Sequence, residues 1–227
     1  MNSFFRDRGP WLAAVVLIMF AISLTQAGIS YTMTFGALGG ILPKNLTPIA
    51  NLVVVVRFGL VAVLAVLWVL KRKQALFRLM IAANALFTLA LFTYTSALFA
   101  VLFGAASEAV RALLFDVLLM AAANILIFSV WYWIVDPPGV EEIPRTEEAW
   151  DFLFPQRGGA LPHYEKWTPR YVDYLFVAFT TSFAFSPTDT LPLTRRAKML
   201  MMLQATISVV TLTGVAGSAI NILAGGK

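Results

Sequence analysis

The sequence predicts an all-α polytopic membrane protein with about five transmembrane helices and one short re-entrant segment. Three observations support this fold class. Hydrophobic residues make up 59% of the 227 residues and charged residues only 13%, whereas soluble domains are roughly 25% charged. The mean hydropathy is +0.79. The apolar residues also gather in long runs that end at basic clusters or at proline and glycine.

Four apolar runs in the first 135 residues are long enough to cross a bilayer, which takes roughly 17–25 residues. They run from about Trp11 to Ile29, Ala50 to Leu70, Leu79 to Gly104 and Val110 to Val135. The first run follows two arginines, and we expect it to be a retained span or a signal anchor. Glycine and proline between residues 28 and 48 predict a loop. Residues 1–135 are therefore predicted to form a four-helix transmembrane region.

Residues 136–170 are predicted to form a hydrophilic loop. The sequence Asp136-Pro-Pro-Gly139 ends the fourth run, because proline cannot continue a helix. Within the loop, Trp150 to Phe154 is amphipathic, and we expect it to lie against the membrane interface or the helix bundle. His163 is expected to be a solvated surface residue.

Residues 171–227 are predicted to contain a re-entrant helix and the last transmembrane helix. The apolar run from Tyr174 to Phe185 is too short to span a bilayer. A polar stretch follows it, and a long apolar helix then opens at Arg195. Non-helical backbone is tolerated at membrane depth only where protein or a water-filled cavity surrounds it. The alternative is that Tyr174 to Phe185 crosses the membrane fully.

This last stretch resembles the pore loop and inner helix of the tetrameric potassium-channel superfamily. In that pattern one aspartate precedes the pore helix, a second closes the filter sixteen residues later, and a proline follows three positions on. Asp173, Asp189 and Pro192 match this spacing without a gap. The filter itself is degenerate, because residues 184–188 read Ala-Phe-Ser-Pro-Thr. The resemblance implies a homo-oligomer, a tetramer, with a pore-domain-like end.

The C-terminal part also resembles an uncharacterised family of bacterial integral membrane proteins. Trp131-Tyr132-Trp133 and the segment from Asp151 to Pro155 carry this second resemblance, together with the stretch above. It implies the bacterial inner membrane as the location and implies no function.

Basic clusters predict the orientation. Lys71, Arg72 and Lys73 form the densest cluster, with Arg78 nearby, and such clusters face the cytoplasm. Counting spans from there places the N-terminus and residues 137–170 in the cytoplasm. If the short run is re-entrant, the cluster from Arg195 to Lys198 also lies inside. If the short run spans fully, that cluster lies outside.

Two charged residues stand inside predicted spans, Arg57 in the second and Asp116 in the fourth. A charge at the centre of a membrane helix costs about 2.5–3.5 kcal/mol on insertion scales. Both are predicted in the outer half of the membrane, roughly 9 Å apart in height. They form a structural ion pair, reach separately for the interface, or act as a gating or proton-coupling pair.

The last helix carries small and polar residues on one face. They recur at helical spacing and are Gln204, Ser208, Thr211, Gly214, Ser218 and Asn221. Such a face indicates close helix packing with interhelical hydrogen bonds. The same residue types also line water-filled pathways, and Gln204, Ser208 and Thr211 are the candidates for that role.

The polar tip before the last helix offers the remaining candidates for an ion pathway, Ser186, Thr188, Asp189 and Thr190. A carbonyl filter needs glycines that this tip lacks. A ring of Asp189 carboxylates would instead favour cations. In the alternative, Asp189 or Thr194 caps the last helix.

The sequence predicts no enzyme, no cofactor, no metal site and no nucleic-acid partner. There is no cysteine, and no nucleotide-binding, zinc or nucleophile motif occurs. The expected partners are the lipid bilayer and either further copies of the chain or other membrane proteins. The expected function is a pore-loop, channel-like protein that passes cations or small solutes. The alternative is a non-conducting membrane scaffold or accessory subunit of a larger complex.

Overall fold

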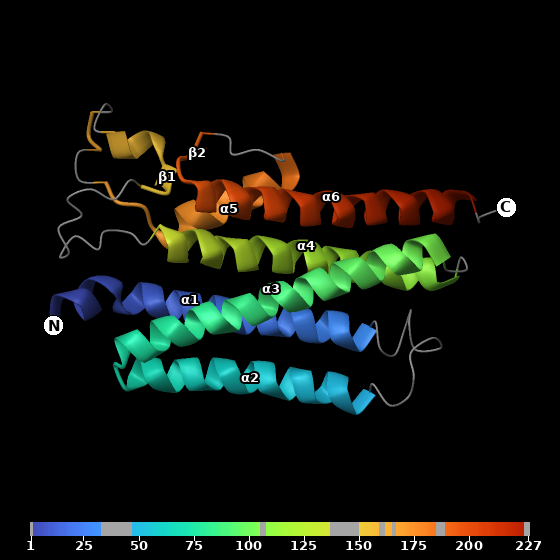
Figure 1. The fold of residues 1–227 in the computed structure, drawn as a ribbon, viewed down its shortest axis with the longest axis horizontal. Coiled ribbons are helices and arrows are strands. Elements are labelled where there is room, and N and C mark those ends of the chain that lie inside the picture. The colour runs from blue at the N-terminus through green and yellow to red at the C-terminus, as the bar shows by residue number, and fades with distance from the viewer. Residues whose placement is uncertain are drawn as a thin grey trace. The chain divides into compact units, whose positions relative to one another are not determined.

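The computed structural model describes residues 2–32, 47–104, 108–136, 150–158, 162–164, 167–184 and 189–224. These residues are mostly helical (Figure 1). The α-helices are α1 (Asn2–Thr32), α2 (Thr47–Val69), α3 (Lys73–Gly104), α4 (Glu108–Val135), α5 (Tyr171–Ala184) and α6 (Arg195–Ala224). Two short strands, β1 (Phe152–Leu153) and β2 (Leu191–Pro192), pair antiparallel, and the 3-10 helix η3 (Pro155–Gly158) follows β1.

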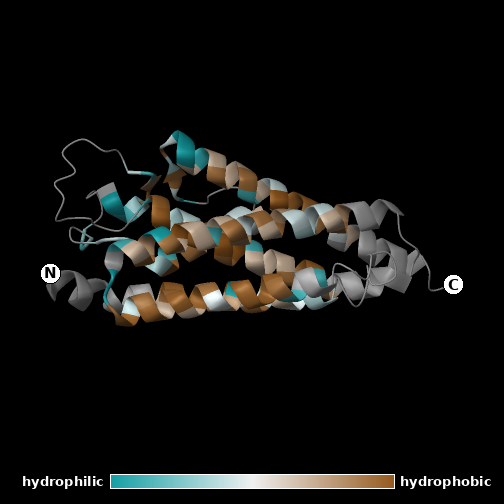
Figure 2. Ribbon diagram, turned by 60° about the horizontal axis from the view of Figure 1, so that its bottom comes forward, coloured by the Kyte–Doolittle hydropathy of each residue, from teal (hydrophilic) through white to brown (hydrophobic). Residues whose placement is uncertain are grey.

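Five helices are long and apolar enough to cross a membrane, as the sequence predicts. The candidate spans are Ala13–Thr32, Asn51–Val69, Gln74–Phe99, Phe115–Val135 and Arg195–Gly214. Hydrophobic residues predominate along these helices (Figure 2). The protein is therefore an integral membrane protein. Helix α5 has 14 residues, or about 21 Å, which is shorter than the ~30 Å hydrocarbon core.

Helix α1 continues past the point where the sequence predicts a loop. It runs through Gly28 to Thr32, and residues 33–46 lie outside the described part of the chain. A Cβ built at Gly28 would lie 3.0 Å from Leu119 Cδ1. The glycine therefore serves close contact between α1 and α4, as small residues do in membrane helices, and does not end the helix.

A tight turn at residues 70–72 joins α2 to α3. Lys71 has a φ of 56°, in the left-handed region that glycine usually occupies at helix ends. Its backbone N donates to Trp68 O, and Arg72 N donates to Leu67 O, each at 3.1 Å. These two bonds form a Schellman motif. The predicted cytoplasmic cluster thus lies on a short, ordered helix turn.

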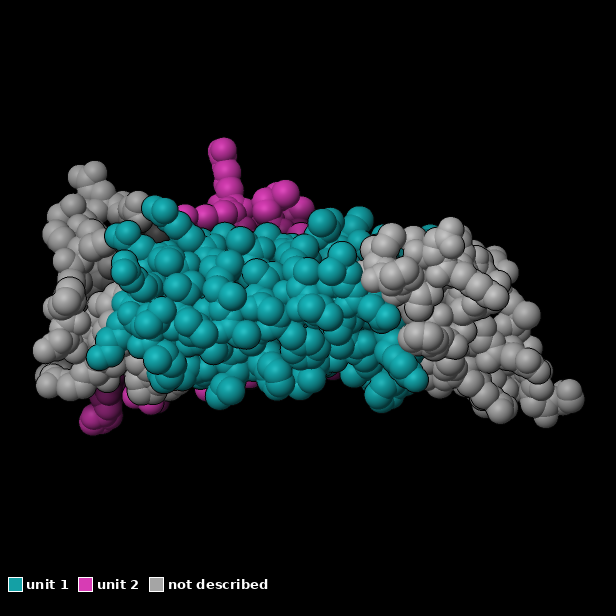
Figure 3. All heavy atoms as spheres, turned by 90° about the horizontal axis from the view of Figure 1, so that it is seen from below, with its two compact units in different colours: residues 1–123, 209–227 teal, residues 124–208 magenta. Residues whose placement is uncertain are grey.

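The chain divides into two compact units (Figure 3). Unit 1 comprises residues 1–123 and 209–227, and unit 2 comprises residues 124–208. In unit 1, α1 packs against α2 and α3, and α2 packs against α3. Fully buried apolar side chains fill their contacts, among them Met19, Ile22, Leu64, Phe87 and Leu91.

Unit 2 has an aromatic core. The rings of Tyr132 and Phe152 lie 5.1 Å apart, and those of Phe154 and Tyr174 lie 5.5 Å apart at 90°. Phe152 and Phe154 belong to the segment that the sequence predicts to be amphipathic, and both are buried. This segment therefore packs inside the protein through its phenylalanines, while Trp150 stays 39% exposed.

Candidate functional site

Gln204 of α6 lies at the centre of a buried hydrogen-bond network in unit 2. Its Nε2 donates to Ala178 O and to Ser182 Oγ of α5, each at 2.7 Å. Its Oε1 accepts a hydrogen bond from the Tyr132 hydroxyl of α4. Gln204 is completely buried. A residue predicted for an ion pathway therefore joins α4, α5 and α6 within one copy of the chain.

Ser208 and Thr211, the other two pathway candidates on α6, are also buried. Asn124 Nδ2 of α4 donates to Ser208 Oγ at 2.8 Å and lies 3.4 Å from Gln204 O. Ser208 is 7% exposed and Thr211 is 3% exposed. The polar face of α6 thus faces protein at all three positions. This placement favours the packing interpretation of the face.

The polar tip before α6 is described only in part. Ser186 and Thr188 lie outside the described residues. Asp189 is exposed and Thr190 is buried. Thr194, the other capping candidate, precedes α6, and its Oγ1 accepts a hydrogen bond from Ala197 N at 3.3 Å. Thr194 is therefore the N-cap of the last helix, as hydroxyl residues commonly are.

Asp173, the first aspartate of the sixteen-residue spacing, stabilises the start of α5. Its Oδ2 accepts a hydrogen bond from Arg170 N at 2.6 Å. A carboxylate in the third helical position that binds back to the N-cap amide forms half of a capping box. Its negative charge also suits the positive end of the helix dipole. Its local role is helix initiation.

Asp136, the residue after α4, holds a buried ion pair. Arg157 Nη1 lies 2.8 Å from its Oδ2 and 3.1 Å from its Oδ1. The Tyr174 hydroxyl donates to Oδ2 at 2.9 Å. Burial raises the pKa of the Asp136 carboxyl, and the charge of Arg157 acts in the opposite direction.

Arg157 is itself enclosed by aromatic rings. Its guanidinium carbon lies 5.2 Å from the ring centroid of Trp150 and 5.7 Å from that of Phe154. Nη1 also donates to Phe152 O at 2.8 Å. Its side chain is only 8% exposed. Arg157 therefore connects β1 and the residues beside it to the end of α4.

Asp151, the residue before β1, connects this strand to the start of α6. Arg196 approaches it through Nε and Nη2, each at 2.6 Å, and the Thr194 hydroxyl donates to it as well. The backbone continues the contact, because Leu193 N donates to Asp151 O at 2.9 Å. Bidentate pairing of this kind fixes geometry as well as charge.

The sequence places Asp136 at the end of a helix and Asp151 in the amphipathic segment, and it predicts no ion pair for either. A signal was present for Asp151, because it stands between Trp150 and Phe152. A carboxylate inside an aromatic run has to be paired when the run is buried. Which cation pairs with it depends on the tertiary structure, since Arg196 lies 45 residues further along the chain.

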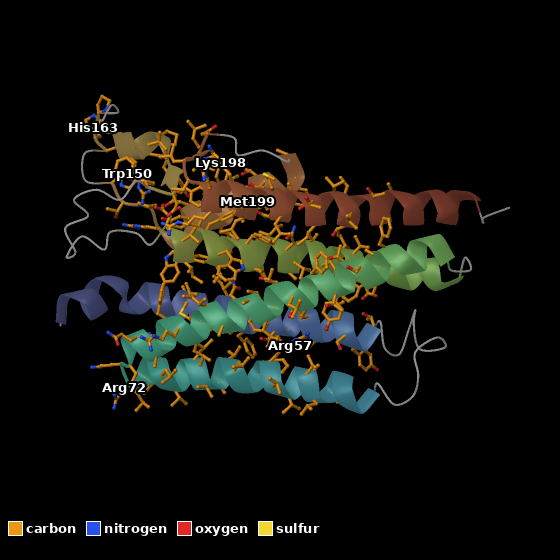
Figure 4. All side chains as sticks on the ribbon, viewed as in Figure 1. Arg57, Arg72, Trp150, His163, Lys198 and Met199 are labelled. Carbon is orange, nitrogen blue, oxygen red and sulfur yellow. The ribbon has the colours of Figure 1, made fainter. Side chains whose placement is uncertain are left out.

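Arg57 and Asp116, the two charged residues within predicted spans, have separate partners. Arg57, labelled in Figure 4, donates through Nη2 to the Tyr94 hydroxyl at 2.9 Å and lies 3.4 Å from Gln26 O through Nη1. Asp116 accepts a hydrogen bond from the Thr32 hydroxyl. Arg57 is 2% exposed and Asp116 is fully buried. Among the described residues, no ion pair joins them.

The side chains of Arg57 and Asp116 each also have one polar atom without a hydrogen-bond partner. Arg57 Nε and Asp116 Oδ2 are buried and make no hydrogen bond. The Tyr94 ring compensates part of the arginine charge, because its centroid lies 5.6 Å from the guanidinium carbon. Arg57 and Asp116 therefore make two separate polar contacts. Arg57 joins α2 to α1 and α3, and Asp116 joins α4 to α1.

Within the described part of the chain, no group of three or more histidine, cysteine or acidic side chains is placed to hold a metal ion. No family model, no curated protein and no solved structure matches this chain.

Proposed function

We propose that the protein is a non-conducting membrane scaffold or accessory subunit, built around α5 as a re-entrant segment. The burial of Gln204 carries this proposal. Its amide makes three hydrogen bonds, to Ala178, Ser182 and Tyr132, all within one copy. A side chain that lines a hydrated pathway keeps a donor or acceptor for water or ions. Gln204 instead connects helices.

The outer surface of the described spans supports the same function. Three of its hydroxyl groups are bonded locally: Thr93, Thr206 and Thr213 donate to the carbonyl four residues earlier, at 2.8–2.9 Å. The large exposed side chains of α2 are valines and leucines. A surface of this kind suits lipid tails or the apolar face of another membrane helix.

Contacts within unit 2 support a re-entrant path. Ala178 and Ser182 of α5 bind Gln204, which lies nine residues, or about 14 Å, from the first residue of α6. Strand β2 follows α5 and pairs with β1, next to Asp151, which binds Arg196. The last turns of α5 thus lie near the level of Gln204, whereas β2 lies beside the start of α6.

The orientation we propose places the N-terminus in the cytoplasm of a bacterial cell, with the protein in the inner membrane. The turn that holds Lys71 and Arg72 and the start of α6 then lie on the same side. Both carry exposed basic side chains, and basic clusters favour the cytoplasmic face.

A flux assay on purified protein in liposomes tests the function. We expect wild-type protein to release potassium ions or small solutes no faster than empty liposomes at any voltage or pH. We also expect Gln204→Leu to lower thermal stability in detergent, because Tyr132, Ala178 O and Ser182 lose their partner. Gln74→Leu is the matched control, since Gln74 is exposed. Flux above empty liposomes would overturn the scaffold function.

A channel-like function is the second candidate, and Asp189 favours it. This carboxylate is exposed and lies between α5 and α6 in the sequence. An exposed carboxylate at the mouth of a pathway attracts cations. In that case the wild-type protein conducts cations, and Asp189→Asn reduces the flux without changing the folded structure.

A further inference from the structure

The sequence distributes its charges unevenly between the two units. Unit 1 contains ten lysines and arginines against three acidic residues, whereas unit 2 contains seven against nine. Between Asp7 and Glu108 the chain has no acidic residue at all. This stretch includes α2, α3 and the four basic residues at and after their turn, which are Lys71, Arg72, Lys73 and Arg78. These four positive charges therefore have no carboxylate within their own helices.

The acidic residues elsewhere in unit 1 offer little compensation at this turn. Glu108 begins α4, four residues after α3 ends, so it lies near the opposite end of the 32-residue helix α3. Asp116 is fully buried and accepts a hydrogen bond from Thr32, the last residue of α1. Asp7 is the third acidic residue of unit 1. One carboxylate does not neutralise four cations, so unit 1 keeps an excess of positive charge at the turn.

The turn between α2 and α3 lies where two candidate membrane spans meet the water. One span ends at Val69 and the next begins at Gln74, so Lys71 and Arg72 lie at the level of the lipid headgroups. Both side chains are exposed, and Arg72 is labelled at this turn in Figure 4. The Schellman bonds described above hold the backbone of the turn. The two cations therefore extend from an ordered position at the membrane surface.

Arg78 lies inside the span that begins at Gln74, and it is exposed. A charged side chain that faces lipid within a span is costly unless it extends to the headgroup level. The first residue of α3 lies five positions before Arg78, or about 8 Å along the helix axis. An extended arginine side chain covers most of this distance, so its guanidinium joins the cations of the turn at the membrane surface.

An exposed apolar stripe follows Arg78 along α3. Ala82, Leu86 and Leu89 follow it at spacings of 4, 4 and 3 residues, which places all four on one side of the helix. The three apolar side chains are exposed, and lipid tails cover such a stripe in a membrane. A cation at the headgroup level and an apolar stripe beneath it match the two parts of a phospholipid molecule.

We propose that the turn between α2 and α3 binds the headgroup of an anionic phospholipid whose tails lie along α3. Arg72 and Arg78 hold the phosphate, because a guanidinium pairs two donors with two phosphate oxygens. The headgroup carries a net negative charge, since the ammonium group of a zwitterionic headgroup would lie among these cations and be repelled. The site does not depend on whether the protein conducts ions.

Thermal unfolding in detergent with added lipid tests the site. Phosphatidylglycerol and phosphatidylcholine with the same acyl chains are compared. We expect phosphatidylglycerol, at about ten times its dissociation constant, to raise Tm by roughly 3–6 °C, and phosphatidylcholine to leave Tm unchanged. The double variant Arg72→Gln, Arg78→Gln should lose most of this rise. The matched control Arg195→Gln, Lys198→Gln removes two exposed cations from unit 2, where acidic residues outnumber basic ones, and should keep it.

Two outcomes of this comparison would overturn the proposal. Equal rises with both lipids would mean that the headgroup charge is not recognised. Equal losses in the two double variants would mean that overall charge, and no site on α2 and α3, attracts the lipid. Glycerol 1-phosphate, the soluble part of the headgroup, tests the contribution of the tails. A rise as large as that with phosphatidylglycerol would show that the ligand is a free phosphate ester.

A second measurement uses the wild-type protein and stays informative if the arginine variants fail to fold. Phosphatidylglycerol with a photoreactive group on its headgroup is incorporated into liposomes with the protein, and the adducts are located by mass spectrometry of peptides. We expect the label to concentrate on residues 70–78. Label spread evenly over the helix ends, or absent from this turn because a second copy or another protein covers it, would overturn the proposal.

Discussion

At the scale of single residues, burial and hydrogen bonding distinguish side chains that connect helices from side chains that are free to line a pathway. Gln204 and Ser208 have buried partners on neighbouring helices, whereas Asp189 is exposed. Their residue types are equally suitable for packing and for lining a pathway. The partners of each side chain therefore distinguish the two roles, and the residue types do not.

The two ion pairs of unit 2 differ in how much solvent reaches the arginine. The side chain of Arg157 is 8% exposed, and that of Arg196 is 58% exposed. We expect Asp136→Asn to lower the free energy of unfolding by about 3 kcal/mol, because it leaves a buried guanidinium without its carboxylate. Asp151→Asn should cost about 1 kcal/mol, because Arg196 can turn toward water.

Chemical denaturation of both variants in the same detergent measures this difference. Arg157→Lys serves as a further control, since it keeps the charge but loses the planar guanidinium that contacts Asp136 and the Trp150 and Phe154 rings. Equal losses for the two aspartate variants would contradict the assignment of Asp136–Arg157 as the stronger contact.

Arg57 and Asp116 have different partners, and their effects on stability should therefore be independent. We expect the losses caused by Arg57→Gln and by Asp116→Asn to add within about 0.5 kcal/mol in the double variant. Thermal unfolding of the four proteins of the cycle measures this sum. Recovery of stability in the double variant would show that the two side chains do meet.

At the scale of elements, two glycines in membrane helices differ in the space around them. A Cβ at Gly28 of α1 would lie 3.0 Å from Leu119 Cδ1, whereas a Cβ at Gly59 of α2 has no neighbour within 4 Å. Alanine favours a helix by about 1 kcal/mol over glycine. We expect Gly59→Ala to gain part of this amount. Gly28→Ala should lose stability or remain neutral, because Leu119 has to move.

The midpoint of thermal unfolding measures the contrast between these two alanine variants. Leu119→Ala in the Gly28→Ala background provides room for the new methyl group and should restore the gain in helix propensity in part. A gain of equal size at both glycines would mean that α1 and α4 are not in close contact at Gly28.

At the scale of the whole molecule, the re-entrant arrangement predicts that two basic clusters share one side of the membrane. Arg72 lies in the turn between α2 and α3, and Lys198 lies in the first turns of α6. We expect Arg72→Cys and Lys198→Cys to react with an impermeant maleimide from the same side. Reaction from opposite sides would restore α5 and the segment after it as a full span.

The sequence by itself determined the membrane character and the helices. Run length and hydropathy are local properties, so five long apolar helices and a sixth short one could be predicted. Their ends are predicted less well, because a helix can continue beyond the apolar run: α1 begins at Asn2 and α3 at Lys73, nine and six residues before the predicted runs. A further error lies at Gly28, where a glycine suggested the start of a loop and the helix continues to Thr32. Local sequence cannot distinguish a glycine that ends a helix from one that lets another helix approach.

The tertiary structure alone decided what each polar side chain contacts. Helical spacing placed Gln204, Ser208 and Thr211 on one face, but spacing does not reveal whether that face meets water or another helix. The pairs Asp136–Arg157 and Asp151–Arg196 join residues 21 and 45 positions apart, and Arg57 meets Tyr94 from another helix. Buried polar groups have to find partners because the apolar interior offers no water. Which partners they find depends on how the helices pack, and that is a property of the whole fold.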